Sequence, residues 1–257
     1  MTTQCIDQTN DESAVTVPVK VWDVPTRVFH WLLAGSFAGA WLTAESERWR
    51  DIHVMLGYTL AGLIAFRIVW GVVGSRYARF SSFVFPPSRV WSYLKSLFGS
   101  APEHHAGHNP AGALAIFLLL GLGLVASASG FAIYQEIGGA GWAERLEDLH
   151  EVAANTMLAV VLVHLVGVLL SSLLHRENLV RSMVTGNKQG RPGEGIVRSG
   201  GWVGIALLVA VLGFWTADRA GWLGSGEATV AQAEQGLDRR GQGDGEHRAK
   251  PGRDRDD

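Results

Sequence analysis

The stretch "LHEVAANTMLAVVLVHLVGVLL", residues 149–170, decides the fold, because it is apolar enough to cross a membrane and yet carries His150 and His164. Fourteen residues of α-helix make nearly four turns and rise about 21 Å, so both imidazoles are expected on nearly one face, at opposite depths. Ionisable groups inside a membrane are costly and usually face a bundle interior, where they meet a partner. The stretch therefore predicts a spanning helix whose two histidines meet groups of other helices.

The composition is typical of a membrane protein. The 257 residues are 47% hydrophobic and only 18% charged, and the mean hydropathy is positive. The formal charge of −2 gives no field that would attract nucleic acid, so a nucleic-acid partner is not expected. Cys5 is the sole cysteine, which excludes an intrachain disulfide and a C-x-x-C-H haem attachment. The polar N-terminus does not resemble a cleavable signal peptide.

Five apolar runs are each close to the ~20 residues that a spanning helix needs. Only helices satisfy the backbone of such segments in lipid, apart from closed barrels. We therefore predict an all-α membrane protein with a four-helix transmembrane bundle and a fifth, C-terminal transmembrane helix. The runs cover residues 28–44, 52–74, 110–134, 149–174 and 200–217.

The charges between the runs predict an orientation. Basic residues gather before the first run, between the second and third, and between the fourth and fifth, whereas the predicted loop 135–151 is net acidic. The positive-inside rule then places the N-terminus in the cytoplasm of a multi-pass protein in the bacterial inner membrane. The odd number of spans leaves the C-terminal tail outside.

Depth in the membrane sorts four histidines into two pairs. His53 opens the second run at the outer side, at the level of His150, and His30 opens the first run at the cytoplasmic side, at the level of His164. Each pair offers two imidazoles from different helices at one level. That arrangement is what bis-histidine ligation of a b-type haem needs.

Other polar residues allow two interpretations each. Arg67 repeats the fourteen-residue spacing from His53, so it is expected near the inner haem, either pairing with a propionate or snorkelling to the headgroups. The cluster of His104, His105 and His108 in "EHHAGHNPAG" is either a metal site or, as is more common for such loops, solvated. His175 is expected at the cytoplasmic interface.

Several motifs resemble the bacterial cytochrome b561 family, including the b-type cytochrome subunits of nickel–iron hydrogenases. They are "VWDVPTRVFHW" (21–31), "HVMLGY" (53–58), "RIVWGVVGSRYARF" (67–80), "GHNPAG" (107–112) and the stretch 149–188, which ends in "HRENLVRSMVTGNK". The resemblance implies a four-helix core with two b haems ligated by histidines of the first, second and fourth helices, and His30, His53, His150 and His164 match those positions.

The resemblance also implies an organisation of the chain. A di-haem domain is expected over residues 20–190, between a polar tail at 1–19 and an additional span within 191–223, and a disordered polar tail is expected at 224–257. The fifth helix and this last tail lie outside the family's core, so the resemblance does not identify the chain's partner.

The function expected from these observations is transmembrane electron transfer through two haems. The family exchanges electrons between a quinone pool and a periplasmic or membrane-bound redox protein, and the iron, not a set of catalytic residues, does the chemistry. Whether the chain acts as a quinone-linked oxidoreductase stays open. The alternatives are an anchor subunit of a hydrogenase, a shuttle for a soluble cytochrome or superoxide, a histidine-lined metal or proton transporter, and a purely structural membrane protein.

Overall fold

The computed structural model describes residues 17–96, 107–174 and 176–222. The expectations for Cys5, His104, His105, His175 and the tail from residue 224 fall outside the described residues. The chain divides into two units, residues 1–208 and 209–257. The first unit contains every histidine of the predicted pairs, and the described part of the second unit is the end of the last helix.

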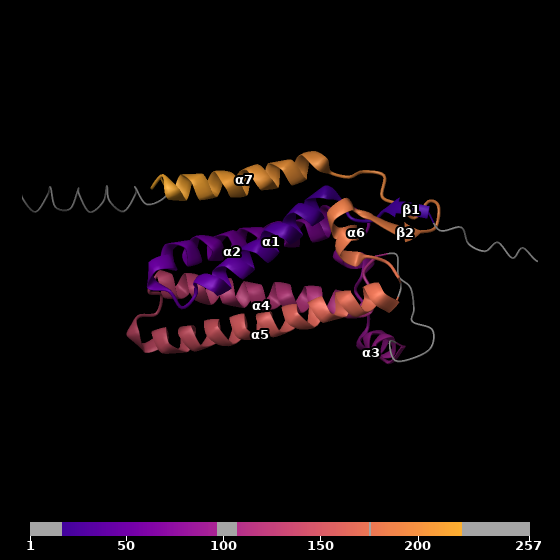
Figure 1. Ribbon diagram of the computed structural model, residues 1–257. Coiled ribbons are helices and arrows are strands. Elements are labelled where there is room, and N and C mark those ends of the chain that lie inside the picture. Colours follow the sequence, from indigo (N-terminus) through magenta and orange to yellow (C-terminus); the bar gives the residue numbers. More distant parts are fainter. Residues whose placement is uncertain (1–16, 97–106, 175, 223–257) are drawn as a thin grey trace, which may run out of the picture. The chain divides into compact units, whose positions relative to one another are not determined.

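The first unit is a helical bundle, which confirms the prediction of an all-α membrane protein. Helix α1 (Val24–Thr43) packs along α2 (Arg50–Val73), α2 along α4 (Pro110–Tyr134), and α4 along α5 (Ala140–Leu174), as Figure 1 shows. Short helices α3 (Pro87–Ser96) and α6 (Leu179–Thr185) lie in the connections, as do two 3₁₀ turns, Glu47–Trp49 and Phe80–Ser82. The last helix, α7, covers Gly201–Arg219.

Four helical segments are long and apolar enough to cross a membrane. They are Glu47–Val73, which joins a 3₁₀ turn to α2, and the helices α4, α5 and α7. Helix α1 is not among them, although it has 20 residues. Its first half carries Arg27 and His30, which lower its hydropathy, and its place in the bundle comes from packing along α2.

Local signals in the sequence explain where two of the helices begin. The side chain of Asp23 caps α1 by accepting a hydrogen bond from the backbone N–H of Thr26 at 2.8 Å. Asn109 caps α4 by accepting from Gly112 N at 2.7 Å, and Pro110 occupies the first turn, where a missing N–H costs nothing. The bounds of α4 are those that the apolar run predicts.

Helix α5 is longer than the sequence predicted. It begins at Ala140, so the predicted loop 135–151 is wrong, and Glu144, Glu147 and Asp148 lie on the first turns of a helix. The reason is composition, because residues 143–147 are mostly strong helix formers. At 35 residues, α5 is about 52 Å long, whereas the hydrocarbon core of a bilayer is about 30 Å thick. The acidic first turns therefore extend beyond the membrane.

A small cap formed by β1 (Val17–Lys20), α6 and β2 (Asn187–Gly190), which the sequence did not predict, covers the end of the bundle opposite the first turns of α5. Strand β1 pairs antiparallel with β2, so that residues from opposite ends of the domain meet. Val21 and Trp22 follow β1 and are buried beneath the pair. Helix α6 leads into β2 through Gly186, whose carbonyl oxygen accepts from Val21 N and Trp22 N at 2.8 and 3.0 Å.

Gly186 is required at this junction by its conformation. Its φ of 88° lies in the left-handed region, which ends α6 and favours glycine. A Cβ added there would also lie 2.8 Å from the carbonyl oxygen of Trp22. The close approach joins the segment before α1 to the segment after α5 at the backbone level.

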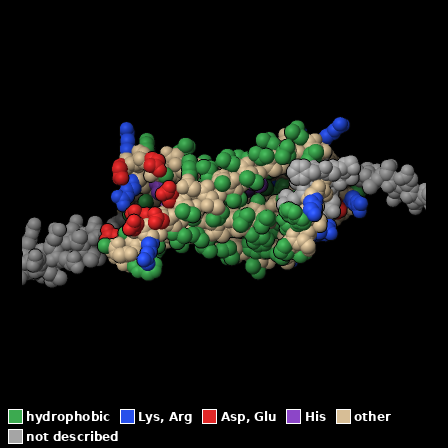
Figure 2. Space-filling model, turned by 90° about the horizontal axis from the view of Figure 1, so that it is seen from below, with side chains coloured by type: hydrophobic (Ala, Val, Ile, Leu, Met, Phe, Trp, Pro, Cys, Tyr) green, Lys and Arg blue, Asp and Glu red, His purple; other side chains and the backbone are tan. Residues whose placement is uncertain are grey.

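The two ends of the first unit carry different charges. We call the end formed by the α1–α2 connection, the α4–α5 connection and the first turns of α5 the acidic end. The end formed by residues 17–23, 74–96 and 176–200 is the basic end. Figure 2 shows the Asp and Glu side chains gathered mainly at one end, with several Lys and Arg side chains among them. The other end carries mostly Lys and Arg side chains, and an apolar band lies between the two. A band of this kind is what a membrane-spanning segment needs.

Candidate haem-binding sites

At the acidic end, the structure brings His53 of α2 and His150 of α5 together. Their ring centres lie 6.1 Å apart, and the ring planes make an angle of 70°. A metal–imidazole bond is about 2 Å long, and the nitrogen lies about 1 Å from the ring centre, so two rings that share one metal have centres about 6 Å apart. The observed separation therefore fits one iron between the two rings.

The imidazole of His53 is oriented by the last turn of α1. Its Nδ1 lies 2.9 Å from the carbonyl oxygen of Ala40. Ala40 is in the final turn of α1, where carbonyl groups lack backbone N–H donors within the helix. Because a carbonyl can only accept, Nδ1 must carry the proton, which leaves the lone pair of Nε2 for a metal.

His150 is held in the same way by a different helix. Its Nδ1 lies 2.9 Å from the carbonyl oxygen of Ala126 in α4 and 3.3 Å from the hydroxyl of Ser129. This carbonyl again selects the tautomer with its proton on Nδ1. Hydrogen bonds of this kind fix the ring orientation and raise the basicity of histidine ligands.

Gly130 of α4 allows His150 to come this close. A Cβ at residue 130 would lie 3.0 Å from Cε1 and 3.2 Å from Nδ1 of His150. Any larger side chain would therefore press on the edge of the ring that faces Ala126. In contrast, a Cβ on Gly121 of the same helix would meet nothing within 4 Å.

Toward the basic end, His30 of α1 and His164 of α5 are electrostatic neighbours. The ring of His30 makes an edge-on contact with Trp31, with centres 5.3 Å apart. The Nδ1 atom of His30 is buried, and no group among the described residues hydrogen-bonds to it. This buried nitrogen has no partner among the described residues and could bind a cofactor, so His30 and His164 are the second candidate pair.

Arg67 lies inside the protein near the basic end. Its side chain is 3% exposed, so the expectation that it snorkels to the headgroups is wrong. Nη1 donates to the carbonyl oxygen of Ala78 at 2.9 Å, and the guanidinium lies over the ring of Phe80, 4.8 Å from its centre. Asp23 is close enough to stabilise its charge electrostatically.

Asp23 connects the start of α1 to this region. One carboxylate oxygen caps α1, and the other accepts from Trp70 Nε1 at 3.0 Å. Trp70 lies in α2, one turn after Arg67. The buried carboxylate thus ties the first helix to the second and lies beside the cation of Arg67.

His108 is largely enclosed by the protein, which corrects the expectation from the sequence that it is solvated. Its ring lies between those of Trp22 and Phe83, with centres 4.6 and 4.4 Å away, and its Nδ1 is buried without a partner in the described part of the chain. Burial, followed by the positive charges of Arg67 and Lys188, lowers the pKa of His108 to about 3. His108 is therefore a neutral part of the cap.

The described residues hold no group of three or more His, Cys, Asp or Glu side chains placed to bind a metal ion. A site for a bare metal ion near His108 thus has no support among them. The paired histidines remain the candidate cofactor ligands.

Comparison with known proteins identifies the family. The model of the prokaryotic cytochrome b561 family matches residues 21–186, which is more than half of the chain. The chain belongs to the prokaryotic cytochrome b561 family. It is therefore a multi-pass membrane cytochrome of the b type, whose cofactor is haem b and whose activity is electron transfer.

Curated relatives of this cytochrome b561 carry a consistent name. A probable Ni/Fe-hydrogenase B-type cytochrome subunit of Azotobacter vinelandii is 30% identical over 210 residues, which cover 65% of this chain and 87% of the relative. The corresponding protein of Rhizobium leguminosarum bv. viciae is 26% identical, covering 66% and 88%. A probable Ni/Fe-hydrogenase 1 B-type cytochrome subunit of Escherichia coli K12 is 28% identical, covering 45% and 60%. No solved structure matches this cytochrome.

Sequence reasoning predicted four histidines as haem ligands, a role that stays a prediction, and it missed the groups that hold His53 and His150. Ala40 and Ala126 contribute only backbone carbonyls, which no residue type signals in a sequence. Asp23 did leave a signal, because an aspartate two residues before a proline at the start of an apolar run is a typical N-cap. The burial of His108 left none, because it depends on residues distant in the sequence.

Proposed function

We propose that this cytochrome b561 carries electrons across the bacterial inner membrane through two haem b groups, between a quinone and a redox partner on the periplasmic side. Haem iron supplies one-electron chemistry when it is bound. His53 and His150 would hold the haem near the acidic end, and His30 and His164 the one near the basic end. Arg67 is proposed to balance the charge of a propionate of the latter.

The observation that carries the proposal is the arrangement of His53 and His150. Two imidazoles from different helices lie with ring centres 6.1 Å apart, and a backbone carbonyl fixes the Nδ1–H tautomer of each. A histidine that merely filled a gap in a bundle would need neither the facing ring nor the same tautomer. The arrangement is what two neutral histidines would need in order to hold one haem iron between them.

The chain itself positions and shields these groups. α1 and α4 contribute the carbonyls that orient the rings, while α2 and α5 contribute the imidazoles. The surrounding apolar helices lower the local dielectric constant, which tunes the potential of a bound haem. Protein groups therefore set position and potential, and the proposal assigns them no catalytic step.

His→Ala variants test the ligand assignment. We expect wild-type protein to give two haems per chain in a pyridine haemochrome assay. His53→Ala and His150→Ala should each remove the same spectral component, and His30→Ala and His164→Ala the other. His108→Phe is the control and should keep both haems.

One haem per chain in the wild type would overturn the two-haem assignment. If His30→Ala and His53→Ala removed the same component, the pairing would be wrong. The quinone is tested separately, by adding a short-chain quinol to the oxidised wild-type protein. Haem bands that stay oxidised would remove the quinone from the proposal and leave the haem count intact.

A more specific candidate is the membrane cytochrome subunit of a nickel–iron hydrogenase complex. It is favoured by relatives that carry this name, two of which the chain covers to 87% and 88% of their length. In membranes of the native host, hydrogen gas should then reduce the haems, and His53→Ala should abolish that reduction. Membranes whose haems respond to quinol but not to hydrogen would contradict this candidate without affecting the haem assignment.

We also propose that the basic end faces the cytoplasm, and with it the N-terminus. The support is that the basic end carries mostly Lys and Arg side chains, whereas Asp and Glu side chains gather at the acidic end and outnumber the Arg side chains there (Figure 2). A reporter that is active only in the cytoplasm, fused before Met1, should give signal. A silent fusion, with a periplasmic reporter active at the same position, would reverse the orientation.

A further inference from the structure

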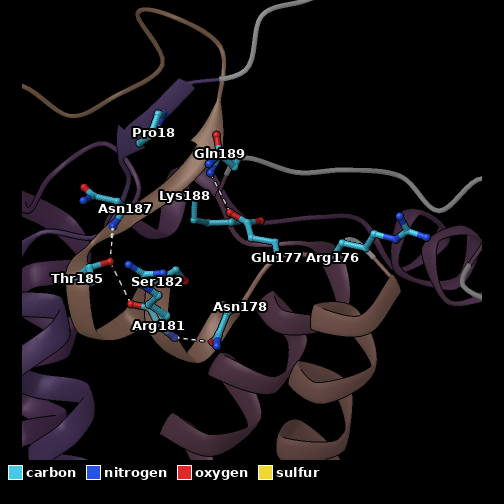
Figure 3. Close-up of a pocket in the computed structure, with 10 residues that line it drawn as sticks. All are labelled: Pro18, Arg176, Glu177, Asn178, Arg181, Ser182, Thr185, Asn187, Lys188 and Gln189. Carbon is cyan, nitrogen blue, oxygen red and sulfur yellow. Dashed lines mark hydrogen bonds and ion pairs between the residues drawn. The ribbon is translucent and has the colours of Figure 1, made fainter.

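A pocket of about 350 Å³ opens in the cap at the basic end, beside the end of α5. It is lined by the turn after α5, by α6 and by β2, as Figure 3 shows. Among the described residues, the lining is polar and includes three cations, Arg176, Arg181 and Lys188, but only one carboxylate, Glu177. This pocket, which we call the basic pocket, takes no part in holding the histidine pairs.

The single carboxylate of the basic pocket is already engaged. One oxygen of Glu177 accepts from the backbone N–H of Gln189 at 2.8 Å, and the other lies 3.9 Å from Nζ of Lys188. Lys188 is 8% exposed, and burial lowers the pKa of its ammonium group while Glu177 opposes that shift. Glu177 and Lys188 thus largely neutralise each other within the cap.

The two remaining cations point to solvent. Arg176 and Arg181 are both exposed, and the described residues give neither of them a carboxylate within ion-pair distance. Figure 3 shows them on opposite sides of the Lys188–Glu177 pair. The basic pocket therefore has a positive excess on both sides of a neutral centre.

Exposed apolar side chains flank the same pocket. Leu173, in the last turn of α5, is 75% exposed, and Val180 and Val184 of α6 are 47% and 56% exposed. The apolar part of α5 ends here, so the pocket lies where hydrocarbon gives way to headgroups. Apolar side chains beside unpaired arginines are the pattern of a surface that contacts lipid at the interface.

We propose that the basic pocket binds the phosphate of an anionic phospholipid, with the acyl chains against Leu173, Val180 and Val184. Arginine suits this ligand because its planar guanidinium can bind two phosphate oxygens at once. A zwitterionic lipid would bring its own cation into a pocket that already has a positive excess, so it should bind less well. The inference depends on neither the haems nor the redox partner.

The test compares a double variant of the pocket with a matched control. Arg176→Gln/Arg181→Gln removes two charges from the pocket, and Arg79→Gln/Arg198→Gln removes two exposed charges from the same end outside it. Native mass spectrometry of the detergent-solubilised full chain would measure phosphatidylglycerol bound at graded lipid concentrations. We expect about tenfold weaker binding for the pocket variant and less than about twofold for the control.

Further binding measurements identify the ligand. Phosphatidylcholine should bind the wild type no better than it binds the pocket variant. Inorganic phosphate at low millimolar concentration should not displace phosphatidylglycerol, and displacement would assign the pocket to free phosphate instead. If the pocket and control variants lost lipid affinity equally, the loss would follow from the total charge of this end and not from the pocket, and the proposed site would be wrong.

Folding of the variants is monitored by their visible spectrum and melting temperature. Arg176→Lys/Arg181→Lys keeps the charge and loses the bidentate geometry, so its affinity should fall between those of the wild type and the glutamine variant. Wild-type affinity in the glutamine variant would refute the proposal.

Discussion

The two ends of the bundle stabilise their buried polar groups in different ways. At the acidic end, His53 and His150 each depend on one backbone carbonyl of a neighbouring helix. At the basic end, Asp23, Arg67, His108 and Lys188 lie in a cap where charged groups and aromatic rings contact each other.

Because of this difference, the two ends should respond differently to amino-acid substitutions. A carbonyl is present whatever the side chain, so the acidic-end site is sensitive to the space around the rings and tolerant of most substitutions nearby. The cap depends on the side chains themselves, since removing one leaves its neighbours buried without a partner. The three predictions below test this contrast, from the largest expected effect to the smallest.

Asp23→Ala should cause the largest loss of stability, because it removes the cap of α1, the acceptor of Trp70 and the charge beside Arg67. We expect a cost of about 2–4 kcal/mol. Thermal unfolding followed by circular dichroism in detergent measures it. Asp51→Ala, in the exposed first turn of α2, is the matched control and should change little. Equal effects of the two variants would show that the stability of the basic end does not depend on the side chain of Asp23 in particular.

Gly130→Ala should weaken only the binding of the haem proposed at the acidic end. The added methyl would press on the ring of His150 and strain its bond to Ala126, so haem retention should fall by roughly tenfold to a hundredfold. Haem loss to an apoprotein acceptor, followed by visible spectroscopy, measures this. Gly121→Ala has space for its methyl and should behave as wild type. If Gly130→Ala retained its haem fully, the site would tolerate a methyl group against the ring of His150, and the expected sensitivity to space around the ring would be wrong.

His108 should make the cap sensitive to acid. Its pKa of about 3 in the folded protein is below the 6.5 of an unfolded chain, so the unfolded state binds the proton first and stability falls as the pH drops from 6.5 toward 3. At pH 5.5 the loss relative to neutral pH should be about 1.4 kcal/mol.

His108→Phe keeps a flat ring between Trp22 and Phe83 and removes the titration. The difference in melting temperature between pH 7.5 and pH 5.5 should therefore be smaller in this variant than in the wild type. Arg67 and Lys188 remain in both proteins, so they do not account for the contrast. An unchanged pH dependence would show that His108 is not held neutral by the cap.

The membrane helices could be predicted from the sequence because lipid imposes one simple rule, a long apolar run for each span. The bounds of α4 followed from Asn109, Pro110 and the apolar run alone. The same rule failed at the start of α5, because residues 140–148 are helical without being apolar. It also says nothing of the β1–β2 pair, whose strands are separated by more than 160 residues.

The proximity of His53 and His150 could be predicted from the sequence, because helical geometry converts spacing into depth. The role of the four histidines as haem ligands stays a prediction. Arg67 was predicted only in part, since its place along α2 followed from spacing but its burial under Phe80 did not. The carbonyls of Ala40 and Ala126 lay beyond reach, because every residue has one and only the packing selects which is used.

Helix α5 carries one histidine of each pair, so this single helix determines the distance between the two pairs along the bundle. His150 and His164 lie on one continuous helix, so the rise of about 1.5 Å per residue fixes the interval between the two levels at about 21 Å. Small movements of the helices against each other alter how closely two rings face across a pair, but they do not change this interval. An electron crossing the membrane would thus meet a step whose length is set by covalent and hydrogen-bond geometry within one helix, whatever the lipid around it.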